Sequence, residues 1–401
     1  MLKTKSWTDS LRFSVDWVNV RVDCPSIHDF MEQICYYCEL NPAEFLPMDG
    51  GMHFYQNGLR YAPAGYSSIV LTWNENEDGS VPTAPTGLSN QYGILVSISG
   101  DGCRFLDSHT SSGLRKFLAV CGQYNYNCTR IDVAMDIFDC ENPIVGLFEE
   151  FGDNAYNPNP GHINIVSGMK RKPGWVTTHR TFDPDEGRMT SNVYIGDPRS
   201  FYKGLCVCYN KKMEMLQGRM KHHAPAIFES LGVDAYWWRV EYRLKASNLA
   251  NKAFSIALGC FAQEVFAFAA SNLFWFCDQT YDLANLAHCD MNPVWEDFLT
   301  WVCCVENEHF VELGRLTAVP YVPKSVKDTL RYFLRMAVYH EKIEQLYERC
   351  PKLRGLSRAY ASVKIISDSD VARMRSFYHD LENWSSESIY DYAKELLNVA
   401  L

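Results

Sequence analysis

One alternating segment, Thr129–Asp139, constrains the fold of this 401-residue chain most. Its apolar and polar residues recur with the period of two that is typical of a half-buried strand. Side chains at alternate positions share a face, so the isoleucine, valine and methionine residues face a core while Arg130, Asp132 and Asp136 face the other way. Two carboxylates on one face repel each other. Such a face is either solvated or suited to a divalent cation, because Mg²⁺ and Mn²⁺ prefer oxygen ligands.

A second segment, Trp237–Lys245, alternates in the same way and carries Arg239, Glu241 and Arg243 on one face. If this strand pairs beside the first, Glu241 completes a carboxylate cluster and the two arginines become phosphate clamps suited to bidentate contacts. If it does not, the three residues form a self-neutralised ladder. Both arrangements are amphipathic, and the sequence leaves both open.

The stretch Val207–Glu214 brings a tyrosine hydroxyl, an amide, two cations and a carboxylate close together. The residues that carry these groups are Tyr209, Asn210, Lys211, Lys212 and Glu214. A phenol with a reference pKa of about 10 is a poor nucleophile at neutral pH, so a tyrosine that attacks phosphate needs positive charge or a metal beside its oxyanion. The stretch therefore fits a nuclease that forms a phosphotyrosine, although a tyrosine at the end of an apolar run is more often a core residue.

The order of these segments, with Val193–Ser200 ahead of the tyrosine stretch, resembles the Rep_trans replication initiators. That family includes initiators of staphylococcal rolling-circle plasmids and of filamentous phages, and relaxases of some conjugative elements. The Tyr-Asn-Lys-Lys spelling is similar to the plasmid initiators, whereas the Ser-Gly-Asp-Gly-Cys-Arg run that ends at Arg104 resembles a segment of the phage initiators. The resemblance covers roughly residues 10 to 250.

The resemblance implies a DNA strand transferase that nicks one strand at a replication origin, keeps the 5′ end on Tyr209 and leaves a free 3′-OH primer, with later religation. It also implies a divalent metal, Mg²⁺ or Mn²⁺, on Asp132, Asp136 and Glu241, with Glu214 as a fourth ligand. Asn210 and Lys211 would accompany the nucleophile. The expected DNA-contacting residues are Arg130, Arg199, Lys203, Lys212, Arg239 and Arg243. Val207 departs from the basic residue that the family often has there, which puts a phosphate contact at that position in doubt.

The net charge of −10 is the main objection to a DNA-binding function, because binding depends on phosphate neutralisation. The distribution of charge weakens this objection. Residues 168–223, which surround Tyr209, hold eleven Lys and Arg against five Asp and Glu. Residues 172–188 are rich in Pro, Gly and Asp and are predicted to be a DNA-contacting loop.

The pattern of elements predicts an α+β fold with a two-lobed, largely antiparallel sheet body and a helical C-terminal region. The expected parts are an N-terminal half at 1–123, a catalytic half at 124–250 and a helical region at 251–401. Arg12–Trp17 loosely resembles the strand that carries Asp132 and Asp136, which suggests an internal duplication. Polar residues interrupt the apolar run from Ala253 to Cys277, so one or two buried helices are expected there and not a membrane span.

The start of the chain lacks a continuous hydrophobic region, so a cytoplasmic location with reduced cysteines is expected. Expected partners are origin DNA, as duplex, hairpin or single strand, a host helicase and polymerase, and a second copy in a homodimer. Two alternatives to a replication initiator remain open. One is a conjugative relaxase with the same chemistry, and the other is a non-catalytic DNA-binding protein that controls copy number.

Overall fold

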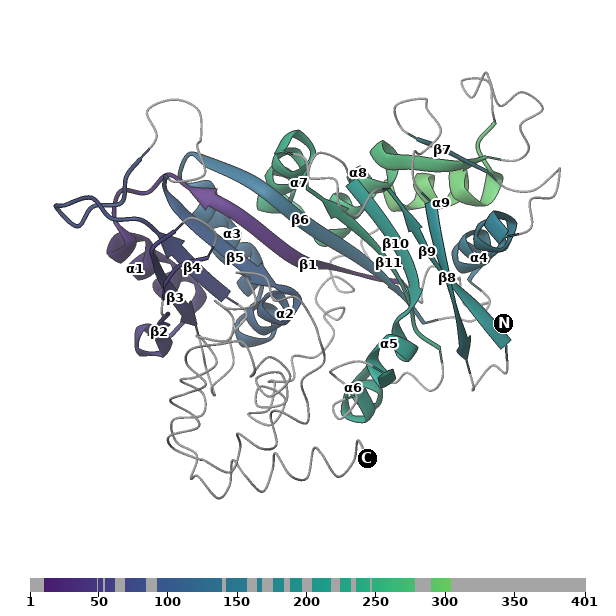
Figure 1. The fold of residues 1–401 in the computed structure, drawn as a ribbon, viewed down its shortest axis with the longest axis horizontal. Helices are drawn as coiled ribbons and strands as arrows, with labels where there is room; N and C mark the ends of the chain where they lie inside the picture. Colours follow the sequence, from purple (N-terminus) through teal and green to yellow (C-terminus); the bar gives the residue numbers. More distant parts are fainter. Residues whose placement is uncertain are drawn as a thin grey trace, which may run out of the picture. The chain divides into compact units, whose positions relative to one another are not determined.

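The computed structural model describes residues 11–303 except for short stretches, and it confirms the predicted α+β fold (Figure 1). The undescribed residues between these limits are 49, 53–54, 62–68, 84–91, 139–141, 157–163, 168–175, 184–187, 197–203, 218–223, 232–235, 246 and 278–289. The part of the predicted helical region that follows residue 303 lies outside the described residues. Contacts group the described residues of Arg21–Gly102 into one unit, and those of Met1–Val20 and Cys103–Tyr321 into another. The division predicted at residues 123 and 250 stays a prediction.

The first unit is an antiparallel sheet with the strand order β2-β3-β4-β5, together with one α-helix. Its elements are α1 (Ile27–Cys38), the 3₁₀ helix η2 (Pro42–Glu44), β2 (Phe45–Pro47), β3 (Asn57–Tyr61), β4 (Ile69–Trp73) and β5 (Ile94–Ser99). Helix α1 begins where Ser26 accepts a hydrogen bond from the Asp29 backbone N–H, and it ends at Glu39 in the left-handed conformation.

The second unit is built on a sheet with the strand order β1-β6-β11-β10-β9-β8. These strands are β1 (Leu11–Val22), β6 (Tyr126–Ile137), β8 (Val176–Asp183), β9 (Arg188–Ile195), β10 (Gly204–Asn210) and β11 (Trp238–Leu244). Strand β11 pairs antiparallel with β6 on one side and with β10 on the other. The two alternating segments are thus neighbours, which answers the question of their pairing that the sequence left open. The prediction of a loop at 172–188 is wrong for residues 176–183. These residues form β8, and several of them are β-branched, which favours a strand.

Helices cover the apolar face of this sheet, as Figure 1 shows for α7 and α8. The remaining elements of the unit are α2 (Gly100–His109), α3 (Gly113–Gly122), α4 (Pro143–Tyr156), β7 (Asn164–Ser167), α5 (Lys211–Gln217), α6 (Ala224–Leu231), α7 (Ser247–Gly259), α8 (Ala262–Leu273), β12 (Phe274–Cys277) and α9 (Pro293–Cys303). Phe266 of α8 packs edge-on against two rings of the sheet. Its ring centroid lies 5.0 Å from that of Tyr242 of β11 and 5.2 Å from that of Phe13 of β1. The buried helices predicted for the apolar run are confirmed, although its last four residues form β12, which pairs with β7.

Eleven cysteines are described, none of them in a disulfide, and nine of them are buried. Among the described residues, the helices are too short or too polar to cross a membrane.

An aromatic cluster around Trp295 should contribute strongly to stability. The Trp295 ring is fully buried, and its centroid lies 5.1 Å from that of Phe276 and 5.8 Å from that of Phe274. We expect Trp295→Ala to lower the free energy of unfolding by about 3–5 kcal/mol, because it removes a large buried ring and leaves a cavity. Urea unfolding followed by circular dichroism measures this. Tyr36→Ala, at a side chain that is 78% exposed, is the control and should change stability little.

Candidate active site

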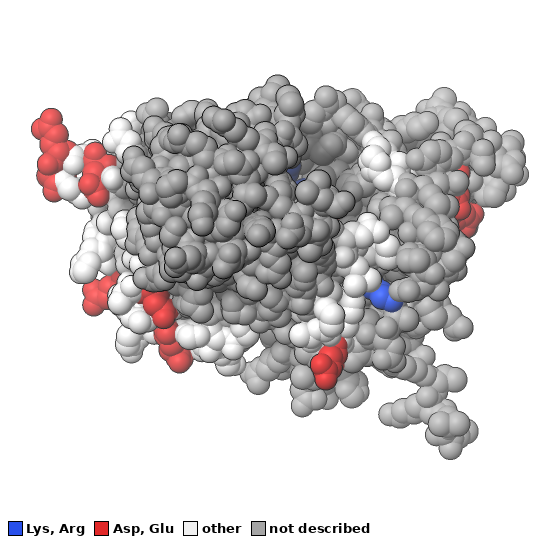
Figure 2. All heavy atoms as spheres, turned by 60° about the horizontal axis from the view of Figure 1, so that its bottom comes forward, with Lys and Arg blue, Asp and Glu red and all other residues white. Residues whose placement is uncertain are grey.

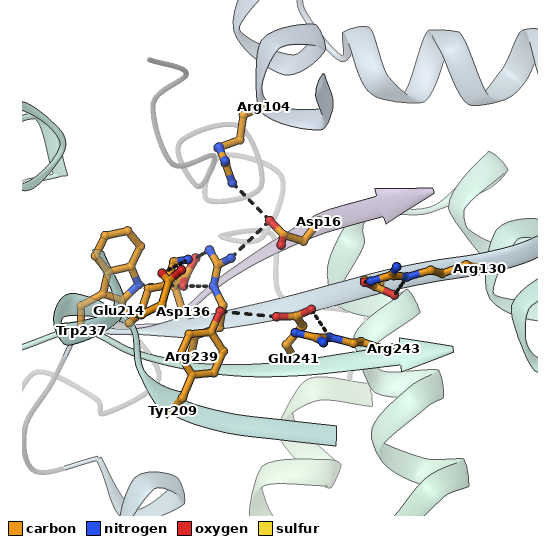
Figure 3. Close-up of polar contacts among 12 residues, drawn as sticks. Asp16, Arg104, Arg130, Asp136, Tyr209, Glu214, Trp237, Arg239, Glu241 and Arg243 are labelled. Carbon is orange, nitrogen blue, oxygen red and sulfur yellow. Dashed lines mark hydrogen bonds and ion pairs between the residues drawn. The ribbon is translucent and has the colours of Figure 1, made fainter. Parts of the chain in front are cut away.

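The register of three strands gathers the predicted site residues on one face of the sheet. Tyr209 of β10 lies opposite Arg239 of β11, and Arg239 lies opposite Asp136 of β6. Directly paired residues point to the same side of a sheet, and so do residues two apart on a strand. One side of this sheet, the polar face, therefore contains Tyr209, Arg239, Glu241, Arg243, Asp132 and Asp136. Figure 3 labels five of them, Tyr209, Asp136, Arg239, Glu241 and Arg243.

Arg239 is as enclosed as its partner Asp136, because each side chain is 1% exposed. Its Nε and Nη2 donate to the two oxygens of Asp136 at 2.7 and 2.8 Å, and its Nη1 donates to Asp16 at 3.2 Å. Trp237 Nε1 donates to the same Asp136 carboxylate at 2.7 Å. Burial works to lower the pKa of Arg239, but the two carboxylates outweigh it and raise the pKa well above its usual value. The guanidinium is thus a permanently charged, fixed group beside Tyr209.

The other two acids of the polar face are also paired with arginines. Asp132 accepts hydrogen bonds from Arg130, and Glu241 accepts one from Arg243 at 2.7 Å. Arg130 also lies over the ring of Trp17, 4.5 Å from its centroid. Burial raises the pKa of Asp132 to about 6, since the opposing effect of Arg130 is smaller.

These acids do not, as arranged, form a ready metal site. Asp132 and Asp136 are four residues apart on one strand, which separates their backbones by about 13 Å. Each carboxylate of the polar face is engaged by a guanidinium, and Glu214 pairs with Lys211 at 2.7 Å. Within the described part of the chain, no three His, Cys, Asp or Glu side chains lie together in a way that would hold an ion. The oxygen donors are of the right type for Mg²⁺ or Mn²⁺, but their placement does not fit a shared ion.

The residues that follow Tyr209 start helix α5. Asn210 Oδ1 accepts a hydrogen bond from the Met213 backbone N–H at 2.9 Å, so Asn210 caps this helix. The backbone N–H groups of Lys211 and Lys212 both donate to the Trp237 carbonyl, which ties the start of α5 to β11. Lys211 Nζ lies 5.7 Å from the centroid of the Tyr209 ring. Asn210 therefore fixes the end of β10, while Lys211 supplies a cation near the ring.

The Tyr209 hydroxyl donates to Glu241 Oε2 across the strands at 3.4 Å. Burial and the nearby Glu241 raise the pKa of Tyr209 well above its usual value, and Arg239 opposes this rise. The phenol is consequently neutral at physiological pH. Glu241 is placed to accept its proton, and the Arg239 charge is placed to stabilise the phenolate as it forms.

Two residues of this arrangement were missed by the sequence analysis. Asp16 of β1 accepts a hydrogen bond from Arg239 and a second one from Arg104 of α2, both at 3.2 Å. The only sequence signals were the loose likeness of Arg12–Trp17 to the β6 segment and the Ser-Gly run that ends at Arg104. Of the predicted DNA-contacting residues, Arg199 and Lys203 lie outside the described residues.

Comparisons with known proteins add little to this geometry. No protein-family model matches the chain, and no curated protein matches it. A solved structure of a rolling circle replication initiator protein from Geobacillus stearothermophilus is similar to it, with 20% sequence identity and a TM-score of 0.49. The match covers 79% of this chain and 100% of that chain. A TM-score below 0.5 carries no conclusion about activity, which must rest on the site itself.

The raised pKa of Asp132 gives a test by pH. A carboxyl whose pKa is higher in the folded state than its ordinary value near 4 favours folding when protonated, and this contribution is lost as pH rises through about 6. The stability of the wild type relative to Asp132→Asn should therefore fall by up to about 3 kcal/mol between pH 4 and pH 7. Urea unfolding of both proteins at several pH values measures the difference. A relative stability that rises over this range would show that Arg130 outweighs burial.

Proposed function

We propose that this protein is a rolling-circle replication initiator, a DNA strand transferase that nicks one strand of its origin through Tyr209. The observation that supports this most is the Tyr209 hydroxyl, which donates to Glu241 beside the fixed guanidinium of Arg239. A nucleophile, a proton acceptor and a cation are thus adjacent on the polar face. This is the set of groups that an attack on a phosphodiester by a phenol requires.

In the proposed step, Tyr209 Oη attacks the scissile phosphorus while the bond from phosphorus to the 3′ oxygen breaks. The phenolic proton passes to Glu241, and the leaving oxygen takes a proton from water to become the 3′-OH. The 5′-phosphate stays on Tyr209 as a phosphodiester-like bond, so the same 3′-OH, or another one, can reverse the step without ATP. Positioning and the fixed charge of Arg239 provide the stabilisation.

A divalent cation, Mg²⁺ or Mn²⁺, remains part of the proposal, although no step above depends on it. When bound, it would supply further charge stabilisation at the phosphate. Asp132, Asp136, Glu241 and Glu214 are the candidate donors. Because they are not arranged around one shared ion, a cation at any of the first three has to displace the arginine that holds it. Loss of nicking in EDTA and its recovery with Mn²⁺ would support this part.

The proposed partner is origin DNA, with Arg130, Arg243 and Lys212 as described candidate contacts and Arg199 and Lys203 outside the described residues. In the view of Figure 2, the visible charged side chains of described residues are mostly acidic. These side chains can neutralise few phosphates on the side of the molecule that is drawn there. A helicase, a polymerase and a second copy of the chain are further proposed partners, and the proposed location is the cytoplasm.

The direct test is nicking of a supercoiled plasmid that carries the origin of the replicon encoding this protein, in Mn²⁺. Wild type should convert it to open circles, and Tyr209→Phe should bind the plasmid but leave it supercoiled. Tyr194→Phe is a matched control, because Tyr194 of β9 lies opposite Val207, on the same side of the sheet as Tyr209. Nicking by Tyr209→Phe would overturn the assignment of the nucleophile.

One observation favours a different class of function. Each acid of the polar face is neutralised by an arginine, an arrangement that also suits a non-catalytic DNA-binding protein of the copy-control type. Such a protein would shift origin DNA on a gel, and neither the wild type nor Tyr209→Phe would nick it. A conjugative relaxase has the same chemistry as an initiator and would differ by nicking a transfer origin.

Glu241→Gln separates the proton acceptor from the rest of the site. The amide keeps the size of the side chain but cannot take the phenolic proton, so nicking should fall by about 10²–10⁴-fold. DNA binding should change little, because Glu241 is 4% exposed and carries no phosphate contact in the proposal. Single-turnover nicking rates and gel shifts measure the two effects. Wild-type nicking by this variant would exclude Glu241 as the proton acceptor.

A further inference from the structure

Asp16 joins two arginines that come from distant parts of the sequence. Its Oδ1 accepts from Arg239 Nη1 of β11 and from Arg104 Nη1 of α2, each at 3.2 Å. Figure 3 shows Asp16 between the two guanidinium groups. The residues are separated along the chain by 88 and 223 positions, so the contact is a product of the fold and not of local sequence.

The two arginines differ in how firmly they are held and how exposed they are. The Arg239 side chain is 1% exposed and contacts Asp136 with two nitrogens at 2.7 and 2.8 Å. The Arg104 side chain is 18% exposed and Asp16 is 21% exposed. Arg104 is thus the member of the pair that a DNA phosphate can reach without disrupting the buried ion pair.

Several guanidinium groups lie around Asp16. Arg12 also belongs to this cluster, since its guanidinium interacts with the Asp136 carboxylate and lies 4.8 Å from the centroid of the Phe138 ring. Three guanidinium groups, those of Arg12, Arg104 and Arg239, thus lie around the carboxylates of Asp16 and Asp136. A phosphodiester carries one negative charge and accepts bidentate contacts from a guanidinium.

We propose that Arg104 binds a backbone phosphate of the DNA strand beside Tyr209, and that Asp16 is the residue that positions Arg104 next to Arg239. This inference rests on the proposed function, because it takes DNA as the ligand of the polar face. The sequence predicted a phosphate contact by Arg239, and the inference assigns this contact to the more exposed Arg104. It also gives a role to the Ser-Gly-Asp-Gly-Cys-Arg run at the start of α2.

The experiment measures binding of a fluorescein-labelled single-stranded origin oligonucleotide by anisotropy, in EDTA and between 50 and 300 mM NaCl. Loss of one phosphate contact should reduce the slope of log K against log salt by about 0.7 for a single strand. Arg104→Gln should show this reduction and a fivefold or greater loss of affinity at low salt. Arg104→Lys keeps the charge and should recover most of the slope. Arg115→Gln, at an exposed arginine of α3, is the matched control and should leave the slope unchanged.

Asp16→Asn tests the positioning role. If Asp16 places Arg104, this variant should lower the salt slope as Arg104→Gln does, and the double variant should lower it no further. A carboxylate with a merely structural role would change stability and leave the slope at the wild-type value. Circular dichroism at the assay temperature confirms that each variant is folded.

The outcomes separate this inference from the proposed function. A wild-type slope for Arg104→Gln overturns the inference even if Tyr209 forms a covalent adduct. A protein that never nicks but loses slope in Arg104→Gln supports the inference and contradicts the nickase. Equal losses in Arg104→Gln and Arg115→Gln would also overturn it, because they would show that any surface cation has the same effect.

Discussion

The ion pair between Arg239 and Asp136 is the interaction on which the site depends. Removing two charges from water carries a large free-energy penalty, which a bidentate contact at 2.7 and 2.8 Å and the additional hydrogen bond from Trp237 help to offset. The pair ties β11 to β6 in one register, and that register places Tyr209 of β10 beside the guanidinium. Removal of either partner would leave an uncompensated buried charge, at a cost of about 3–5 kcal/mol.

Neutralisation of the acids makes the proposed binding of an anionic DNA strand compatible with a net charge of −10 for the chain. Glu241 is held by Arg243 on one oxygen and accepts a hydrogen bond from Tyr209 on the other, so one carboxylate links the Tyr209 hydroxyl to a cation. The same pairing keeps the acids from forming a shared metal site. DNA phosphates are natural competitors for these arginines, because they accept the same bidentate contacts as carboxylates.

The sequence predicted the faces of β6 and β11 correctly, because a period of two is a local property that side chains of one strand reveal. It also named Tyr209, Asp136 and Arg239 as candidates, and the strand register places these three residues side by side. It could not predict which arginine holds which acid, because contacts across strands depend on register and on strand order. The contacts of Asp16 and Arg104 cannot be predicted from the sequence for the same reason. The Pro and Gly residues that flank β8 favour a loop there, although its β-branched residues form a strand.

The central claim is that Tyr209 is a nucleophile towards DNA, and a suicide substrate tests it most directly. An origin oligonucleotide with sulfur in place of the bridging 3′ oxygen releases a thiol that religates poorly, so a covalent intermediate accumulates. Digestion and mass spectrometry should then find the 5′-phosphate on the peptide that contains Tyr209. An adduct on another residue, or bound oligonucleotide with no adduct, would contradict the account.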